Sequence, residues 1–193
     1  DRGPNGECPA LPILPLTDNV TTITTQINNM NPDGGTNIQS GTIWGFRVLS
    51  PTEPFTQGRT YNTATAKVMI IMTDGQNWSN IINSTINNNY YYTWYGFMHP
   101  DADRTRIGTY NMEDDTSFRS KMNARTGDTC ENAKAAGITI YTVGLNPPDS
   151  ATRTMLTDCA TQNSMAYFPN DPSELDDVFA SIAEQLSQLR IER

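Results

Sequence analysis

The chain has few of the residues that catalysis, zinc binding and nucleic-acid binding use most often. It contains one histidine, His99, three cysteines and no Cys-x-x-Cys pair, which argues against a structural zinc site. Its 13 basic residues against 21 acidic ones give a net charge of −8. Nucleic acids and anionic membranes both attract clustered Lys and Arg, so neither is an expected partner. No apolar run approaches the roughly 18 residues of a membrane-spanning helix, and no signal-peptide pattern opens the sequence.

The most informative segment is an apolar run, Val68–Met72, which is followed by Thr73-Asp74-Gly75. Five consecutive apolar residues, some of them β-branched, predict a strand buried on both faces of a parallel sheet. Ligands of open α/β sheets bind at the carboxyl ends of the strands, where Asp74 is placed. The alternative is that Asp74-Gly75 only begins a turn.

A glycine-rich loop upstream of this strand supplies a second candidate ligand-binding residue, Thr36. In Asp33-Gly34-Gly35-Thr36, the Thr36 hydroxyl can cap the helix that follows. A hydroxyl on such a loop, facing a carboxylate at a strand end, can hold a hard divalent cation because such cations prefer oxygen ligands. We therefore predict that Thr36 and Asp74 converge at the carboxyl edge of the sheet.

Helices and strands alternate from residue 37 to the end, which predicts an α/β fold with a doubly wound, mostly parallel sheet flanked by helices. The strand at 138–143 is expected beside 68–72, with a short strand at 165–168 beyond it. A divergent Asn- and Tyr-rich insert, at about 78–128, forms either part of a contact surface or a surface excursion over its own small core. Helices are predicted at about 20–30, 37–49, 130–136, 151–161 and 171–189, the last with Asp171 as its N-cap.

Together these segments resemble a von Willebrand factor A domain, in which Thr36 and Asp74 would be two ligands of the metal-ion-dependent adhesion site. The resemblance narrows to the TadG-type pilus-assembly proteins of bacteria, whose A domain lies outside the inner membrane. It rests on Pro15-Leu16-Thr17, Gly35-Thr36-Asn37-Ile38, Ser40-Gly41-Thr42-Ile43-Trp44-Gly45-Phe46-Arg47-Val48-Leu49-Ser50-Pro51, Met72-Thr73-Asp74-Gly75-Gln76-Asn77 and Leu189-Arg190-Ile191.

One part of the family pattern is missing. A domains begin with a strand that ends in Asp-x-Ser-x-Ser and supplies three metal ligands, and nothing between Asp1 and Thr36 has this pattern. Residues 1–193 are therefore expected to be the C-terminal portion of one such domain. An N-terminal fragment or another subunit would complete the sheet, and the site for Mg²⁺ (or Mn²⁺ or Ca²⁺) would depend on ligands outside this chain.

The resemblance implies a non-enzymatic binding or adhesion module with a partial metal-ion-dependent adhesion site. Its protein partner would offer an acidic side chain, with pilus components as candidates. The expected location is the periplasm or cell surface of a bacterium, with the parent protein anchored in the inner membrane. Two alternatives are a structural A domain with a non-functional metal site and a metal-dependent hydrolase, in which Asp74 would act beside the metal.

The cysteines also bear on location. Cys130 and Cys159 lie in two predicted helices that flank one strand, and the extracytoplasmic family makes a disulfide between them the expected state. Cys8 would then need a partner in the N-terminal part outside this chain. The alternative is a cytosolic protein in which all three cysteines are buried thiols.

Overall fold

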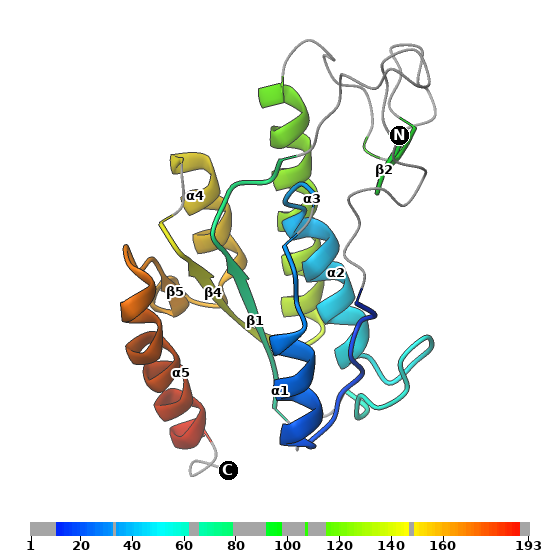
Figure 1. The fold of residues 1–193 in the computed structure, drawn as a ribbon, viewed down its shortest axis with the longest axis vertical. Coiled ribbons are helices and arrows are strands. Elements are labelled where there is room, and N and C mark those ends of the chain that lie inside the picture. The colour runs from blue at the N-terminus through cyan, green and yellow to red at the C-terminus, as the bar shows by residue number, and fades with distance from the viewer. Residues whose placement is uncertain are drawn as a thin grey trace. The chain divides into compact units, whose positions relative to one another are not determined.

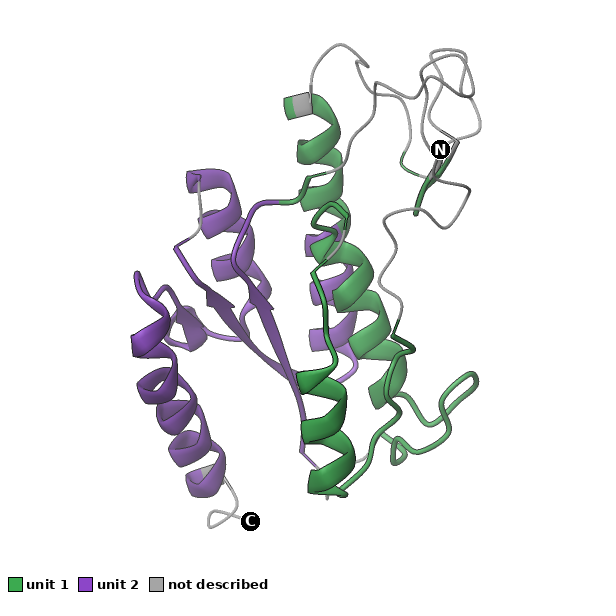
Figure 2. Cartoon of the chain, in the orientation of Figure 1, with its two compact units in different colours: residues 1–65, 77–125 green, residues 66–76, 126–193 purple. Residues whose placement is uncertain are grey.

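The computed structural model describes residues 11–32, 34–61, 66–78, 92–97, 107, 115–146 and 149–189 (Figure 1). The chain forms two compact units (Figure 2). Unit 1 comprises residues 1–65 and 77–125, and unit 2 comprises residues 66–76 and 126–193. No helix in the described ranges combines the length and the apolar character that a membrane span requires.

Unit 2 contains a parallel three-stranded sheet of β1 (Lys67–Thr73), β4 (Ile138–Gly144) and β5 (Ala166–Tyr167), in the order β1-β4-β5. β1 and β4 are in register along their whole length, from Lys67 opposite Ile138 to Thr73 opposite Gly144. The α/β class, the parallel pairing and the strand order agree with the sequence-based predictions.

Helices cover both faces of β4. On one face, Tyr141 and Val143 pack in a buried cluster with Ile182 of α5 (Leu175–Leu189). On the other face, the Thr142 hydroxyl donates to the Leu156 carbonyl of α4 (Ser150–Cys159) at 2.9 Å. Because neighbouring residues of a strand point to opposite faces, α4 and α5 lie on opposite sides of β4, as a doubly wound sheet requires.

The prediction that β1 is buried on both faces is wrong for the described residues. Met69 and Ile71 are buried, but Ile70 and Met72 are 41% and 47% exposed. The β1–β4 register places these two exposed residues on the face that carries Tyr141, the face that α5 covers at β4. Within the described ranges, no strand pairs with the other edge of β1.

The C-terminal helix begins much as predicted. The Asp171 carboxylate accepts from the Ser173 amide at 2.8 Å and caps a short 3-10 helix, η2 (Pro172–Glu174), that leads directly into α5. The predicted apolar stripe is partly wrong, because Phe179 is exposed while its neighbour Val178 packs against the core. Another 3-10 turn, η1 (Asn163–Met165), precedes β5.

Unit 1 contains α1 (Val20–Asn28), α2 (Ile38–Leu49), a hairpin of β2 (Tyr92–Thr93) and β3 (Gly96–Phe97), and the first part of α3 (Asp115–Ala135). Its buried cluster consists of Tyr95, Ile107, Phe118 and Met122. Although α1 forms where predicted, none of its residues is buried. The apolar residues that predicted it lie largely at the surface in this structure.

The helix predicted at 130–136 begins much earlier, at Asp115, inside the expected insert. Its buried residues recur at intervals of one to four positions, as on one face of a helix. The helix ends at Ala135, shortly before Gly137, whose positive φ of 82° suits a helix stop. Two of the buried positions are threonines, so polar residues interrupt the apolar pattern that sequence analysis relies on. The buried residues are Phe118, Met122, Thr126, Thr129, Cys130 and Ala133.

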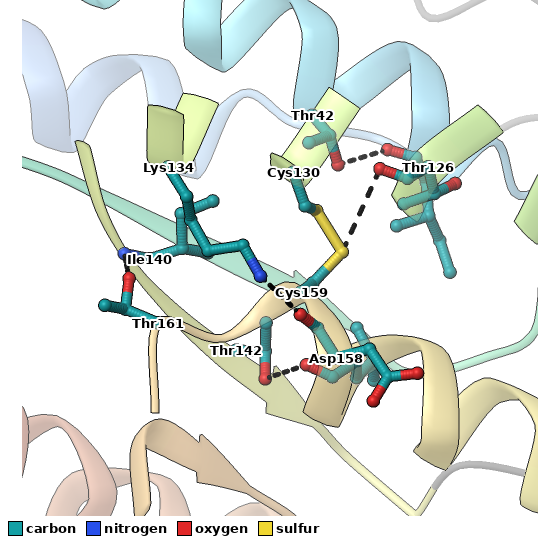
Figure 3. The surroundings of a disulfide bond; sticks show 11 residues. Thr42, Thr126, Cys130, Lys134, Ile140, Thr142, Asp158, Cys159 and Thr161 are labelled. Carbon is teal, nitrogen blue, oxygen red and sulfur yellow. Dashed lines mark hydrogen bonds between the residues drawn. A yellow bond between two sulfur atoms is a disulfide. The ribbon is translucent and has the colours of Figure 1, made fainter. Parts of the chain in front are cut away.

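The predicted disulfide between Cys130 of α3 and Cys159 of α4 is confirmed (Figure 3). Both cysteines are fully buried. Beside them, the Lys134 ammonium donates to the Asp158 carbonyl at 2.6 Å and adds a second link between the two helices. Cys8, the third cysteine, lies outside the described residues.

Candidate cation-binding loops

The loop before α2 places Thr36 directly ahead of the helix cap. The cap itself is Asn37, whose side-chain oxygen accepts from the Ser40 amide at 2.9 Å, so the prediction that Thr36 caps the helix is wrong. Both residue types are good caps, and the helix begins one residue later than that prediction required. As a result, capping does not use the Thr36 hydroxyl.

The Thr36 hydroxyl makes no hydrogen bond within the described part of the chain, whereas the Thr36 carbonyl accepts from the Trp78 amide at 2.8 Å. Gly35 makes the close approach of these two segments possible. A Cβ at Gly35 would lie only 2.5 Å from the Trp78 carbonyl oxygen, a distance that no side chain tolerates. The backbone therefore fixes the loop, and the Thr36 side chain keeps an oxygen that can bind a ligand.

The second candidate, Asp74, follows the last residue of β1. The Thr73 hydroxyl donates to the Gly75 carbonyl at 2.8 Å and lies 3.2 Å from the Gly75 amide, so a side chain shapes the turn around Asp74. The Leu145 amide donates to the Thr73 carbonyl at 2.9 Å and continues the β1–β4 pairing past the strand end. Asp74 itself is exposed, and its carboxylate has no hydrogen bond or ion pair among the described residues.

Asn77 ends one of the motifs that carry the A-domain resemblance, but sequence analysis assigned it no role in the site. It is fully buried, and its side-chain oxygen accepts from the Ile38 amide at 2.8 Å. Its side-chain nitrogen donates to the Asn123 side-chain oxygen of α3 at 2.8 Å. The partners lie 39 and 46 residues away in sequence, so no local pattern could have revealed this contact.

The hairpin of the insert contacts the same end of α2 through Tyr95. Its hydroxyl lies 3.3 Å from the Gln39 side-chain oxygen and 3.5 Å from that of Asn37. Burial raises the pKa of Tyr95 to about 12, although the Asn37 hydrogen bond and the Arg125 charge oppose this effect. The insert thus reaches the helix that follows the Thr36 loop.

The donor set of the two predicted site residues suits a hard cation, because a hydroxyl and a carboxylate are the oxygen ligands that Mg²⁺ and Mn²⁺ accept. Thr36 belongs to unit 1 and Asp74 to unit 2, and each is described within its own unit. No group of three or more His, Cys, Asp and Glu residues with metal-binding geometry occurs in the described ranges. Among the described residues, a metal site built on Thr36 and Asp74 would therefore need further ligands of other types.

Comparison with known proteins identifies the fold. Neither a protein-family model nor a curated protein matches the sequence. Among solved structures, the chain is similar to the vWF domain of the type V pili tip protein Mfa5 from Porphyromonas gingivalis. That similarity has a TM-score of 0.61 at 16% identity and covers 90% of this chain and 74% of that one.

A second similar structure is the pilus adhesin SpaC from Lactobacillus rhamnosus GG, with a TM-score of 0.52 at 18% identity. The match covers 87% of this chain and 20% of SpaC, so the chain corresponds to about a fifth of that protein. At these identities the likeness shows the fold alone. The chain has a von Willebrand factor A-like α/β fold.

Proposed function

We propose that this chain is a non-enzymatic binding module in which a divalent cation takes an acidic side chain of a partner protein as a ligand. Thr36 and Asp74 would hold part of the cation's coordination sphere. The observation that carries the proposal is that both side chains have oxygens without hydrogen-bond partners in the described ranges. These are the two residues that the A-domain resemblance selects.

Coordination chemistry explains why such a site would bind a carboxylate. Mg²⁺ is octahedral, keeps several waters and is bound through few protein carboxylates. With one hydroxyl and one carboxylate from this chain, the ion would retain positive charge and exchangeable positions for an incoming acidic oxygen. Mn²⁺ and Ca²⁺ accept the same oxygen ligands.

The remaining ligands and the missing sheet neighbour would come from an N-terminal segment of the same protein or from another subunit. In this proposal, residues 1–193 form the C-terminal portion of one A-like domain, with an insert at about 78–128. Among the described strands β1 pairs on one edge only, and Ile70 and Met72 are exposed. Both observations support a partner strand at this position, because apolar strand edges are normally paired or covered.

The pilus setting of the two similar structures supports an adhesive role outside the cytoplasm. The Cys130–Cys159 disulfide supports an oxidising compartment such as the periplasm or the bacterial cell surface. On the sequence motifs, we assign the chain to the extracytoplasmic part of a Tad-type pilus-assembly protein whose parent is anchored in the inner membrane. Its partner would then be a pilus component.

The test is a Mn²⁺ titration of the complete protein, with any companion fragment detected by mass spectrometry retained. Asp74→Asn and Thr36→Val should each weaken Mn²⁺ binding by about ten-fold or more, since each removes a direct or water-mediated ligand, and a ten-fold loss corresponds to about 1.4 kcal/mol. Asp176→Asn and Thr154→Val remove the same groups from exposed positions of α5 and α4 and should leave binding unchanged.

Two outcomes would overturn the proposal. Absence of Mn²⁺ binding by the complete wild-type protein would indicate a structural A domain with a non-functional site. Metal-dependent hydrolysis that disappears in Asp74→Ala would indicate a hydrolase. In contrast, weak Mn²⁺ binding by residues 1–193 alone is expected, because two ligands are too few for a dedicated site.

A further inference from the structure

Asn77 joins three segments of unit 1 with one side chain. Its oxygen accepts from the Ile38 amide, which belongs to the first residue of α2 and has no partner inside the helix. Its nitrogen donates to Asn123 of α3. With no exposed surface, the amide of Asn77 is held by these contacts instead of by water.

The next residue strengthens the same contact. The Trp78 amide donates to the Thr36 carbonyl at 2.8 Å, and the Trp78 carbonyl lies so close to Gly35 that only glycine fits there. Residues 35–38 and 77–78 are therefore joined by two hydrogen bonds and one close backbone approach. Thr36 lies within the first segment, and its side-chain hydroxyl makes no hydrogen bond in the described ranges.

We propose that Asn77 is the positioning residue of the cation site, an inference that rests on the proposed function. Together with the Trp78 amide, its side chain fixes the loop that carries Thr36 to residues 77–78 and to α3. These contacts all lie within unit 1, and they hold the Thr36 loop in place whether or not a cation is bound.

Holding the Thr36 loop in place before a cation binds reduces the conformational entropy that is lost on binding. Ligands from two different loops lose conformational freedom when one ion joins them, and this loss weakens binding unless the loops are already held. Groups that orient metal ligands without touching the metal typically change metal affinity by roughly 10- to 100-fold when mutated. Asn77 is placed to act in this way on Thr36.

The test compares Asn77→Ala with Asn123→Ala in the complete protein and measures two properties. The first is hydrogen exchange at the Ile38 and Trp78 amides without metal, and the second is Mn²⁺ affinity. Asn77→Ala should accelerate exchange at both amides and weaken Mn²⁺ binding by roughly 10-fold or more. Asn123→Ala keeps the bond to Ile38 but loosens Asn77, so it should give a smaller change in the same direction. Asn132→Ala, at an exposed position of α3, is the matched control and should change neither property.

The two readouts separate failure of this inference from failure of the proposed function. Faster Ile38 exchange with wild-type Mn²⁺ affinity would show that Asn77 has only a structural role, while the cation site would stand. If Asn77→Ala does not fold, Asn123→Ala provides the test. Wild-type Mn²⁺ affinity in a folded Asn123→Ala that shows faster Trp78 exchange would also overturn the inference. If the wild-type protein does not bind Mn²⁺, the proposed function fails and the positioning role fails with it.

Discussion

At the scale of single residues, Tyr95 and its neighbour Trp94 have opposite roles in the hairpin of the insert. Trp94 is half exposed, with its ring 6.1 Å from that of Trp44. Tyr95 is only 4% exposed and packs edge-on against Phe118, with ring centroids 6.0 Å apart. The hairpin is therefore anchored through Tyr95, while Trp94 keeps about half of its surface exposed.

The burial of Tyr95 predicts a loss of stability at alkaline pH. Its pKa is about 12 in the folded protein, whereas an unfolded tyrosine titrates near pH 10. Above about pH 10 the unfolded chain loses a proton that the folded protein keeps, so the free energy of unfolding falls as the pH rises toward about 12. Below about pH 10 this contribution is complete.

Urea denaturation at about pH 9, 10 and 11 measures the effect, and the decline should be shallower in Tyr95→Phe. Burial also raises the pKa of Tyr141, with a smaller contribution from Tyr167, so some decline will remain in this variant. An identical decline in Tyr95→Phe and in the wild-type protein would contradict the assignment to Tyr95.

The candidate site shows what can be predicted for individual residues. Thr36 and Asp74 stand out because a glycine-rich loop and a strand end are visible in the sequence itself. Asn77 does not stand out, because its role comes from an amide 39 residues away and a side chain 46 residues away. Tertiary contacts of this length are set by packing, which a single sequence does not display.

At the scale of elements, the strands of the sheet were predicted within one residue of their observed bounds. β4 and its position between β1 and β5 follow from an apolar, β-branched run that ends at a glycine, together with the rule that parallel strands are linked by crossovers. α3 was largely missed because Thr126 and Thr129 occupy buried positions, so its buried face does not look apolar in the sequence.

The Cys130–Cys159 disulfide joins α3, which precedes β4 in the sequence, to α4, which follows it. It should contribute measurably to the free energy of unfolding. The cysteines are 29 residues apart, and closing a loop of this length in the unfolded chain corresponds to about 3.6 kcal/mol. The double variant Cys130→Ala/Cys159→Ala should lower the free energy of unfolding by about this amount, plus a smaller loss from the removed sulfur atoms.

Chemical denaturation of the oxidised and variant proteins checks this prediction, with reduction of the wild-type protein as an independent comparison. Thiol titration under denaturing, non-reducing conditions should detect at most one free thiol, that of Cys8. A count of three free thiols would show that the bridge does not form in the purified protein.

At the scale of the whole molecule, the part of the sheet that the structure describes ends on an apolar strand. β5 is only two residues long, whereas β1 is seven residues long and, in the described ranges, pairs on one edge only. Ile70 and Met72 are exposed beside that edge. A long apolar edge strand is a template for pairing with another chain, so this part of the molecule should find a partner strand in solution.

The final prediction is that residues 1–193, expressed alone, are insoluble or oligomeric because β1 pairs with another copy. Ile70→Lys and Met72→Lys should reduce this self-association while changing the free energy of unfolding little, since both side chains are already 41–47% exposed. Ile71→Lys buries a charge on the opposite face and should prevent folding instead. Analytical ultracentrifugation across a concentration series distinguishes these variants. A monodisperse 21.4 kDa monomer of the unmodified chain would show that the edge of β1 is already covered by residues within the chain.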